Sequence, residues 1–343
     1  MGIRQLASDL QLSIGTVSRA LNDRPDVNPE TRARVKAAAA RAGYVPDQSG
    51  RSLRSGRTGM IAAVIPTRGF APSSDSGLFT VLEGVRRSLR SHALDLIVLF
   101  RGPDEDPLEN LQRIVQRRIA DAVIISSTVC MDPRIAYLKA TGVDYVAFGR
   151  SAGLDDYPFV DFDFEAMAAE AFRIFLADGH RRMALATSEE PLNYELIAYE
   201  TFRAEAERSG LGPHAVRMLP MLQGRMTDAA RALFTAGSRP PTAVLATHEG
   251  IAAALYGDFA DLGLAVGSDV SVVCTFPVLD GRALAPGLSH FDADLEAVGV
   301  AIGDRLVARI VESADPGAVE SLLVPLRFAA RASHGRAPLP VTA

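Results

Sequence analysis

The chain has 343 residues, a length that predicts two or three folded units with a large buried core. Apolar residues make up 48% and charged residues 22%, which excludes a largely disordered chain, and only two cysteines are present, which excludes a disulfide scaffold. The sequence shows no export signal and no apolar run long enough to span a membrane, so we expect a cytoplasmic protein without membrane contact.

The net charge of −5 is divided unevenly along the chain. Residues 1–59 contain ten basic and five acidic side chains, a balance of +5, whereas the other 284 residues contain 26 basic and 36 acidic ones, a balance of −10. This division suggests a small basic module that faces a polyanion and a larger acidic module with another task. Chance clustering in a short window is the alternative.

The first sixty residues predict three short helices. Ile3 opens a run of apolar side chains at positions i, i+3, i+4 and i+7, which share one face of the first helix. Ser13 is placed to cap a second helix, and Asn28 and Pro29 begin a third that ends before Gly43. The tight break between the first two helices is typical of a helix-turn-helix unit, so we expect an all-α head.

The outward face of the second predicted helix has side chains suited to the major groove of DNA. Arg19 can make a bidentate contact with guanine, Ile14 can meet a thymine methyl group, and Ser18 can donate to a phosphate oxygen. A three-helix bundle with an ordinary polar surface is the alternative. The candidate DNA-binding residues of the head are Ser13, Ile14, Gly15, Thr16, Ser18, Arg19 and Asn22.

Five runs of sequence follow one another almost without gaps in this part of the chain: Ile3–Ala7, Ser13–Asn22, Val27–Val35, Gly43–Pro46 and Arg51–Arg54. Together they resemble the lac repressor / gal repressor family of bacterial transcription regulators.

The resemblance implies a hinge helix that forms only on the operator DNA. Leu53 then wedges into the minor groove, and Arg51 and Arg54 neutralise phosphates beside it. A flexible linker is the competing interpretation and is compatible with such a hinge. Gly50 replaces the alanine usual in the family and should weaken the helix by roughly 1 kcal/mol.

Beyond Thr58, short apolar runs alternate with amphipathic stretches of helical length, a pattern that predicts parallel sheets covered by helices in two similar lobes. We expect strands at 60–65, 94–100, 122–126, 145–148, 183–187, 242–247 and 270–274, and helices that include 78–91, 166–177, 198–208 and 251–262. No dinucleotide, P-loop or nucleophile-elbow motif occurs, and the six histidines form no ligand spacing. We therefore expect no enzyme, no catalytic residue, no cofactor and no metal site.

Weaker landmarks of the same family continue through the body, for example at Asp121–Ile125, Phe148–Arg150 and Asp178–Leu185. They imply an α/β body like that of a periplasmic sugar-binding protein, with two doubly wound lobes, three crossover strands and a small molecule in the cleft. The family pattern gives these expected parts: a helix-turn-helix domain at 1–45, a hinge or linker at 46–58, an effector-binding and dimerisation domain at 59–330 (lobe one at about 59–160 plus 291–318, lobe two at about 161–290 plus 319–330) and a tail at 331–343.

The resemblance also implies candidate effector-binding residues. Asn193 and Tyr194 align with a loop that contacts sugar in related regulators, and Arg150 aligns with a position at the edge of the cleft. Phe79 sits where the first lobe often supplies an aromatic face, although a core role is equally open. The full set is Phe79, Arg150, Asn193, Tyr194, Glu249 and Phe276.

The sequence departs from the family pattern at three places, and the loss of one cation and one anion among them makes the expected pocket more apolar. Ala198 stands where the family usually has a ligand-binding arginine, His248-Glu249 replaces an Asn-Asp pair, and Phe276 replaces a frequent aspartate. A sugar or polyol is the first expectation for the ligand, and other small metabolites are the alternative.

Together these features predict a homodimeric DNA-binding transcriptional regulator, and they favour a repressor of carbohydrate-utilisation genes whose affinity for double-stranded operator DNA is set by a sugar-like effector. A regulator that responds to a non-sugar metabolite and a DNA-binding protein without a ligand are the alternatives.

Overall fold

The computed structural model of the protein describes residues 2–21, 23–44, 56–67, 76–212, 214–222, 224–235, 239–276, 284–311 and 321–338. The chain divides into two compact units, Met1–Gly59 and Met60–Ala343.

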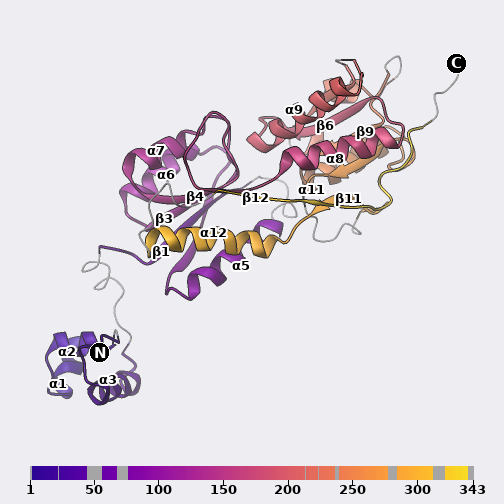
Figure 1. Cartoon of the computed structure of the whole chain (residues 1–343). Coiled ribbons are helices and arrows are strands. Elements are labelled where there is room, and N and C mark those ends of the chain that lie inside the picture. Colours follow the sequence, from indigo (N-terminus) through magenta and orange to yellow (C-terminus); the bar gives the residue numbers. More distant parts are fainter. Residues whose placement is uncertain are drawn as a thin grey trace. The chain divides into compact units, whose positions relative to one another are not determined.

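The smaller unit contains three helices around its own core, α1 (Ile3–Asp9), α2 (Ile14–Leu21) and α3 (Pro29–Arg41) (Figure 1). The Asn28 side chain accepts a hydrogen bond from the Glu30 N–H and caps α3, as its position before Pro29 predicts. The core residues are Leu6, Ala7, Val17, Ala20, Val27, Val35 and Ala39. The prediction of an all-α helix-turn-helix head is confirmed.

A six-stranded parallel sheet forms the first lobe of the larger unit, in the order β12-β5-β4-β3-β1-β2. Its strands are β1 (Met60–Pro66), β2 (Asp95–Arg101), β3 (Ala122–Ile125), β4 (Asp144–Phe148), β5 (Phe159–Phe162) and β12 (Leu322–Val324). Its helices are α5 (Ser76–Arg90), α6 (Pro107–Gln116), α7 (Pro133–Thr141) and α12 (Leu295–Ile310). Because successive strand residues point to opposite faces, α5 and α12 pack on one side of β1 and α6 and α7 on the other.

A seven-stranded sheet forms the second lobe, in the order β13-β11-β10-β9-β6-β7-β8, with antiparallel pairs only at β11·β13 and β7·β8 among the described strands. Its strands are β6 (Met183–Ser188), β7 (Val216–Leu222), β8 (Arg225–Met226), β9 (Ala243–Ala246), β10 (Ser271–Cys274), β11 (Ser289–Asp292) and β13 (Arg327–Ala329). Its helices are α8 (Phe164–Ala177), α9 (Asn193–Arg208), α10 (Asp228–Ala232) and α11 (Glu249–Asp261). Helices α8 and α9 pack on one face and α10 and α11 on the other, so the prediction of two doubly wound lobes is confirmed.

The chain crosses between the lobes three times, from β5 to α8, from β11 to α12 and from β12 to β13 (Figure 1). The placement of residues 319–330 in lobe two was wrong for β12, because Leu322 pairs with Val160 and Val324 with Phe162 in the first sheet. The expected boundaries at 160 and 291 also cut through strands: β5 belongs to the first sheet up to Phe162, and β11 belongs to the second.

The segment expected to be a separate tail is partly built into lobe two. The Ser333 carbonyl accepts a hydrogen bond from the Val272 N–H at 2.8 Å, and the Gly335 carbonyl lies 3.0 Å from Nε2 of the buried His180. The Ala337 N–H donates to the Asp178 carbonyl at 2.9 Å. Burial lowers the pKa of His180, although its hydrogen bond with Gly335 acts in the opposite direction. The described tail residues therefore bind β10 and the turn before β6.

Helices α5 and α12 lie side by side on the first sheet, and two glycines set their close approach (Figure 1). A Cβ atom on Gly84 would lie 2.2 Å from the Glu296 carbonyl oxygen. A Cβ on Gly299 would lie 2.9 Å from the Gly84 Cα and would overlap the Val81 carbonyl. Both obstacles are backbone atoms, so neither helix can accept a side chain here without moving away from the other.

Replacing Gly299 with alanine should therefore destabilise the protein by about 1–3 kcal/mol through overpacking. Gly257 provides a matched control, because it lies inside α11 with open space where a Cβ would be. Gly257→Ala should stabilise by about 0.5–1 kcal/mol through helix propensity alone. Urea unfolding measures the free energy of unfolding of both variants. If Gly299→Ala and Gly257→Ala changed it in the same direction and by the same amount, close packing of α5 against α12 would not explain Gly299.

Candidate functional site

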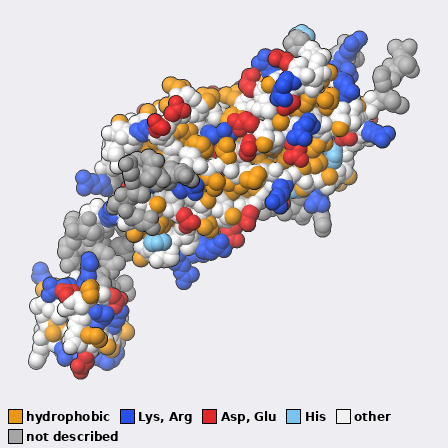
Figure 2. All heavy atoms as spheres, in the orientation of Figure 1, with side chains coloured by type: hydrophobic (Ala, Val, Ile, Leu, Met, Phe, Trp, Pro, Cys, Tyr) orange, Lys and Arg blue, Asp and Glu red, His pale blue; other side chains and the backbone are white. Residues whose placement is uncertain are grey.

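The exposed part of α2 presents several of the predicted DNA-binding residues. Ile14 is 46% exposed, and Gly15 and Arg19 are exposed as well. The Ser13 hydroxyl accepts a hydrogen bond from the Thr16 N–H at 3.0 Å, so Ser13 caps α2 as predicted. Figure 2 shows basic side chains (blue) among acidic ones (red) on the visible face of this unit.

Two residues of α2, Ser18 and Arg19, have contacts within this unit that bear on DNA binding. Ser18 is only 7% exposed, so its placement on the outward face was wrong: it follows Val17 around the helix and lies at the edge of the buried stripe. Arg19 lies 3.5 Å from Asp26, an exposed pair that contributes little to stability. Asn22, Arg51, Leu53 and Arg54 lie outside the described residues.

A cavity of about 170 Å³ lies between the two lobes. On lobe one its walls come from the carboxyl ends of β1, β3 and β4 and from the first turn of α5. On lobe two they come from the amino-terminal turn of α9 and from the residues that follow β9 and β10. The carboxyl ends of parallel strands are where open α/β sheets bind ligands, so this cavity is the candidate effector site.

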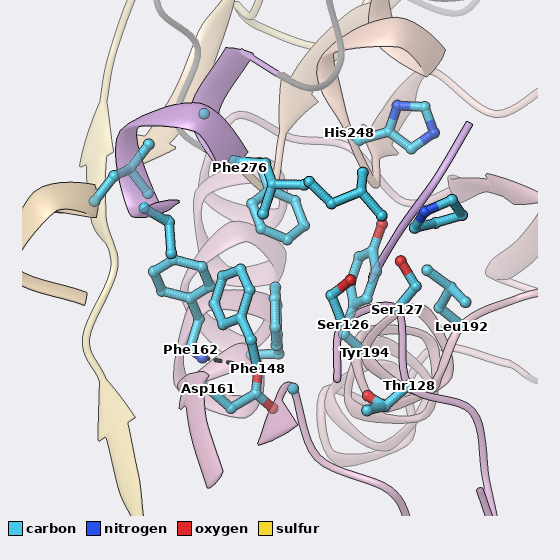
Figure 3. Close-up of a pocket in the computed structure, with 18 of the residues that line it drawn as sticks. Ser126, Ser127, Thr128, Phe148, Asp161, Phe162, Leu192, Tyr194, His248 and Phe276 are labelled. Atoms are coloured by element: carbon cyan, nitrogen blue, oxygen red, sulfur yellow. Dashed lines mark hydrogen bonds between the residues drawn. The ribbon is translucent and has the colours of Figure 1, made fainter. Parts of the chain in front are cut away.

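One side of the cavity is a cluster of aromatic rings, which we call the aromatic wall: Phe148, Phe162, Phe164, Tyr194 and Phe276. Figure 3 labels four of them, Phe148, Phe162, Tyr194 and Phe276. The centre of the Phe276 ring lies 5.2 Å from that of Tyr194 and 5.6 Å from that of Phe162, both edge to face. Because Phe148 and Phe162 belong to lobe one and the other three to lobe two, the wall spans both lobes. A ligand that contacts it contacts both lobes at once.

Hydroxyl and carboxyl groups line other parts of the cavity (Figure 3). The Ser126 hydroxyl donates to the Val64 carbonyl at 3.2 Å, and the Thr128 hydroxyl donates to the Arg150 carbonyl at 2.6 Å. Each hydroxyl oxygen keeps lone pairs that can accept from a ligand. Asp161 supplies a carboxylate that is almost completely buried.

The departures from the family pattern also lie at the cavity. His248 Nδ1 accepts a hydrogen bond from the Ile251 N–H at 3.3 Å and caps α11, and Glu249 is the first residue of that helix. Both line the cavity with Phe276. Among the described lining residues there is no lysine or arginine, so these walls favour a neutral ligand over an anion.

Arg150 faces two carboxylates instead of the cavity. Its Nε lies 2.9 Å from Asp161, and its terminal nitrogens contact Glu165 at 2.6 and 3.0 Å. Burial raises the pKa of Asp161 more than the hydrogen bonds from Arg150 lower it. Burial lowers the pKa of Arg150, but the hydrogen bonds with Glu165 and Asp161 outweigh this effect and raise it. Arg150 thus holds Asp161 in place at the cavity and connects it to the first turn of α8.

Asn193 joins the two lobes beside the cavity. Its N–H donates to the Thr128 carbonyl at 2.9 Å, and its side-chain oxygen accepts from the Ala152 N–H at 3.1 Å and from the Cys130 thiol at 3.2 Å. Asn193 begins α9 in lobe two, whereas its three partners lie in loops of lobe one. We call this set of contacts the Asn193 latch. Because Thr128 also lines the cavity, the latch and the ligand site share a residue.

A buried carboxylate fixes the loop that carries the latch. Glu195 is fully buried, and its oxygens accept hydrogen bonds from the N–H groups of Ser188 at 3.0 Å and Leu192 at 2.8 Å and from the Thr247 hydroxyl. These bonds close the first turn of α9. They therefore set the positions of Asn193 and of the neighbouring Tyr194.

The structure brings together three of the six predicted effector-binding residues: Tyr194, Glu249 and Phe276 line the cavity. The other three are not among the lining residues, and their contact with an effector stays a prediction. Phe79 is 57% exposed on α5, Arg150 is turned to its carboxylates, and Asn193 is 1% exposed within the latch.

Sequence reasoning missed several lining residues, chiefly Ser126, Ser127, Thr128, Phe148, Asp161 and Phe162. A signal for some of them was present. Ser126 and Phe148 end predicted strands, and the carboxyl ends of parallel strands meet at one edge of a sheet.

The described residues were also searched for membrane-spanning helices and for metal-binding clusters. No helix of the described part of the chain is long and apolar enough to cross a membrane. The described residues also contain no group of three histidine, cysteine or acidic side chains that could hold a metal ion.

Comparisons with known proteins agree with this architecture. Residues 3–47 match the lacI family of bacterial regulatory proteins, and residues 172–334 match a periplasmic binding protein-like domain. The chain is 33% identical to the HTH-type transcriptional regulator AglR of Rhizobium meliloti (98% of this chain, 95% of the relative). It is 28% identical to RafR of Escherichia coli (97% and 99%).

Two solved structures share the fold. A lac repressor dimer bound to operator and the anti-inducer ONPF superposes with a TM-score of 0.80 at 20% identity (97% of this chain, 98% of the other). A complex of the regulator CelR with cellobiose gives a TM-score of 0.70 at 22% identity (97% and 99%).

The latch leads to a prediction for Asn193. Asn193→Leu leaves the Ala152 N–H without its acceptor and should cost about 1–3 kcal/mol of folding stability. It should also let the lobes separate, so the radius of gyration of the body, measured by small-angle X-ray scattering, should rise. Cys130→Ala removes only the thiol hydrogen bond and should change neither quantity measurably. An Asn193→Leu protein as compact and as stable as the wild type would refute the latch.

Proposed function

Since the chain belongs to the lacI family of bacterial regulatory proteins, we propose that it is a homodimeric repressor of carbohydrate-utilisation genes whose affinity for operator DNA is controlled by a sugar-like effector between its lobes. It is a DNA-binding transcriptional regulator and not an enzyme. The observation that carries the proposal is the combination, in one chain, of a helix-turn-helix unit with an exposed α2 and a two-lobed body with a cavity that both lobes line.

For DNA recognition we propose that α2 enters the major groove. Arg19 would contact guanine or phosphate, Ile14 a thymine methyl group, and Gly15 would let the backbone approach closely. Ser13 and Thr16 would donate to phosphates, with Asn22 beside them. Residues 46–58 would form the hinge, with Leu53 as the minor-groove wedge between Arg51 and Arg54.

Two such heads explain how a small module reaches useful specificity, because a dimer reads two half-sites at once. The lac repressor structure with the same fold is a dimer on its operator, which supports this assembly.

For the effector we propose a neutral sugar or polyol. The aromatic wall suits the C–H face of a sugar ring, and Ser126, Thr128 and Asp161 supply groups that bind hydroxyls. The absence of a cation among the described lining residues argues against sugar phosphates and acids. The extent of the aromatic wall keeps a neutral non-sugar metabolite as the second candidate.

Effector binding would act on DNA binding through the lobes. A ligand that touches both sides of the aromatic wall and lies beside the Asn193 latch changes how the lobes close. A coupling of 1–3 kcal/mol is enough to change operator affinity about 5- to 150-fold.

Arg19→Ala should reduce binding to a selected operator by about 1–3 kcal/mol, whereas binding to unrelated DNA at the same salt concentration should change little. Arg41→Ala is the matched control, because it removes the same charge from the exposed end of α3. Mobility-shift titration of the full chain on both DNAs measures the effect. Equal losses for the two variants, or for the two DNAs, would contradict the role given to α2.

A further inference from the structure

Lobe two contains a separate cavity of about 480 Å³ beside strand β7. Helix α9 contributes Tyr199 and Arg203 to its lining, α10 contributes Ala229, and β7 contributes residues 216–218 and 220. None of its lining residues lines the effector site. The cavity is therefore not part of the cleft between the lobes.

Strand β7 forms an open edge of the second sheet at this cavity. Only its last two residues, Met221 and Leu222, pair with β8. Residues 216–220 pair with β6 and with no other strand of the described residues. An edge of this kind leaves a row of backbone N–H and C=O groups without a strand partner.

The pairing of β6 with β7 determines which groups face outward. The Met183 N–H of β6 donates to the Ala215 carbonyl at 2.7 Å, so the odd-numbered residues of β7 bond to β6 in this parallel ladder. The even-numbered residues direct their backbone groups away from β6. Pro220, which has no N–H, takes one such outward position. The outward groups of Val216 and Met218 have no hydrogen-bond partner in the described part of the chain.

The charged side chains of this cavity are basic. They are Arg203 and Arg217, and no acidic side chain is among the described lining residues. Arg217 lies 3.4 Å from Nδ1 of His214 and forms no ion pair with the described residues. Arg203 contacts Glu200 at 3.3 and 3.4 Å, an exposed pair that contributes little to stability. Both guanidinium groups can therefore bind a carboxylate of another molecule.

The two arginines lie on opposite sides of the edge. Val216 packs in the core beneath α8 and α9, whereas Leu219 packs in the core beneath α10 and α11. Because side chains alternate along a strand, Arg217 lies on the same side as Leu219, while Arg203 comes from α9. A strand added at this edge would direct alternate side chains to the two sides and would reach one arginine on each.

We propose that this edge binds an extended acidic segment of another protein, which joins the sheet as a strand beside β7. Outward N–H and C=O groups alternate at Val216 and Met218, and an extended peptide pairs with both kinds. A small anion would meet the carbonyl oxygens as well as the N–H groups, so it fits the edge less well. Residues 216–220 span about 17 Å, enough for a segment of about five residues. The inference adds a protein partner to the proposed function and does not depend on the effector.

The experiment measures the binding of a fluorescein-labelled peptide to the full-length protein by fluorescence anisotropy. The peptide Glu-Val-Glu-Glu-Val-Glu presents glutamates to both sides of the edge when it is extended. One control peptide has lysine in place of glutamate, and another has a methyl group on every amide nitrogen, which removes its N–H donors. We expect the acidic peptide to bind at least about tenfold more tightly than either control.

Two results with these peptides would overturn the inference. If the methylated peptide bound as tightly as its parent, charge alone would explain the binding and no strand would be added. The absence of binding, or equal binding of the lysine peptide, would show that the edge takes no acidic segment. Operator binding is measured separately, so either result leaves the proposed function standing.

Variants assign the binding to β7. Arg203→Ala and Arg217→Ala should each weaken binding of the acidic peptide about two- to fivefold, and the double variant about tenfold. Arg208→Ala is the matched control and should change nothing, because Arg208 also lies on α9 and pairs with the glutamate three residues before it, but outside the cavity. All three arginines are exposed, so folding is not at risk.

Equal losses for Arg203→Ala and Arg208→Ala would contradict a site at this edge. Sedimentation velocity of the double variant tests the other occupant, a second copy of this chain. We expect the double variant to keep the oligomeric state of the wild type. Dissociation of the double variant into monomers would place the second copy at β7 and overturn the inference.

Discussion

The body depends on one constraint: two parallel sheets present their carboxyl ends to a common space, and the chain crosses between them three times. The crossings join the lobes, and the Asn193 latch, the ion pair of Arg150 with Glu165 and the aromatic wall also connect them. Under the proposed function, a ligand at these contacts would shift the balance between lobe arrangements by a coupling of about 1–3 kcal/mol. The cavity and the latch share Thr128, so ligand binding and lobe closure would act on the same residue.

The charged side chains around the cavity are paired with one another or replaced by uncharged ones. Arg150 is placed near it but is held by Asp161 and Glu165, and the positions where the family resemblance implies a cation and an anion are occupied by Ala198 and Phe276. In the proposed function, the aromatic wall would supply the contact with the ligand and Asp161 a fixed acceptor. Specificity would then depend on shape and hydroxyl positions more than on ion pairing.

Local signals predicted much of the fold. The caps at Ser13 and Asn28 and the seven expected strands agree with the structure to within a residue at each end, because capping and continuous apolar runs are properties of short segments. The strands β5, β7, β8, β11, β12 and β13 were not among the expected ones; β5 and β12, for example, pair with each other across 160 residues of sequence, which no local pattern shows. The site residues were misplaced because their positions depend on contacts between distant parts of the chain. No local pattern shows that Ser18 lies at the edge of a core, that Arg150 finds two carboxylates, or that Asn193 bonds across to the other lobe.

The most direct test of this account is amide hydrogen exchange with and without operator DNA. The N–H groups of Ala152 and Asn193 bond across the lobes, whereas the Val272 N–H bonds within lobe two. If lobe closure is coupled to DNA binding, operator should change the exchange rates at Ala152 and Asn193 by about tenfold or more and leave Val272 unchanged, because 1.4 kcal/mol of coupling corresponds to that factor. Protection confined to α2, with no change at the two inter-lobe amides, would contradict the coupling.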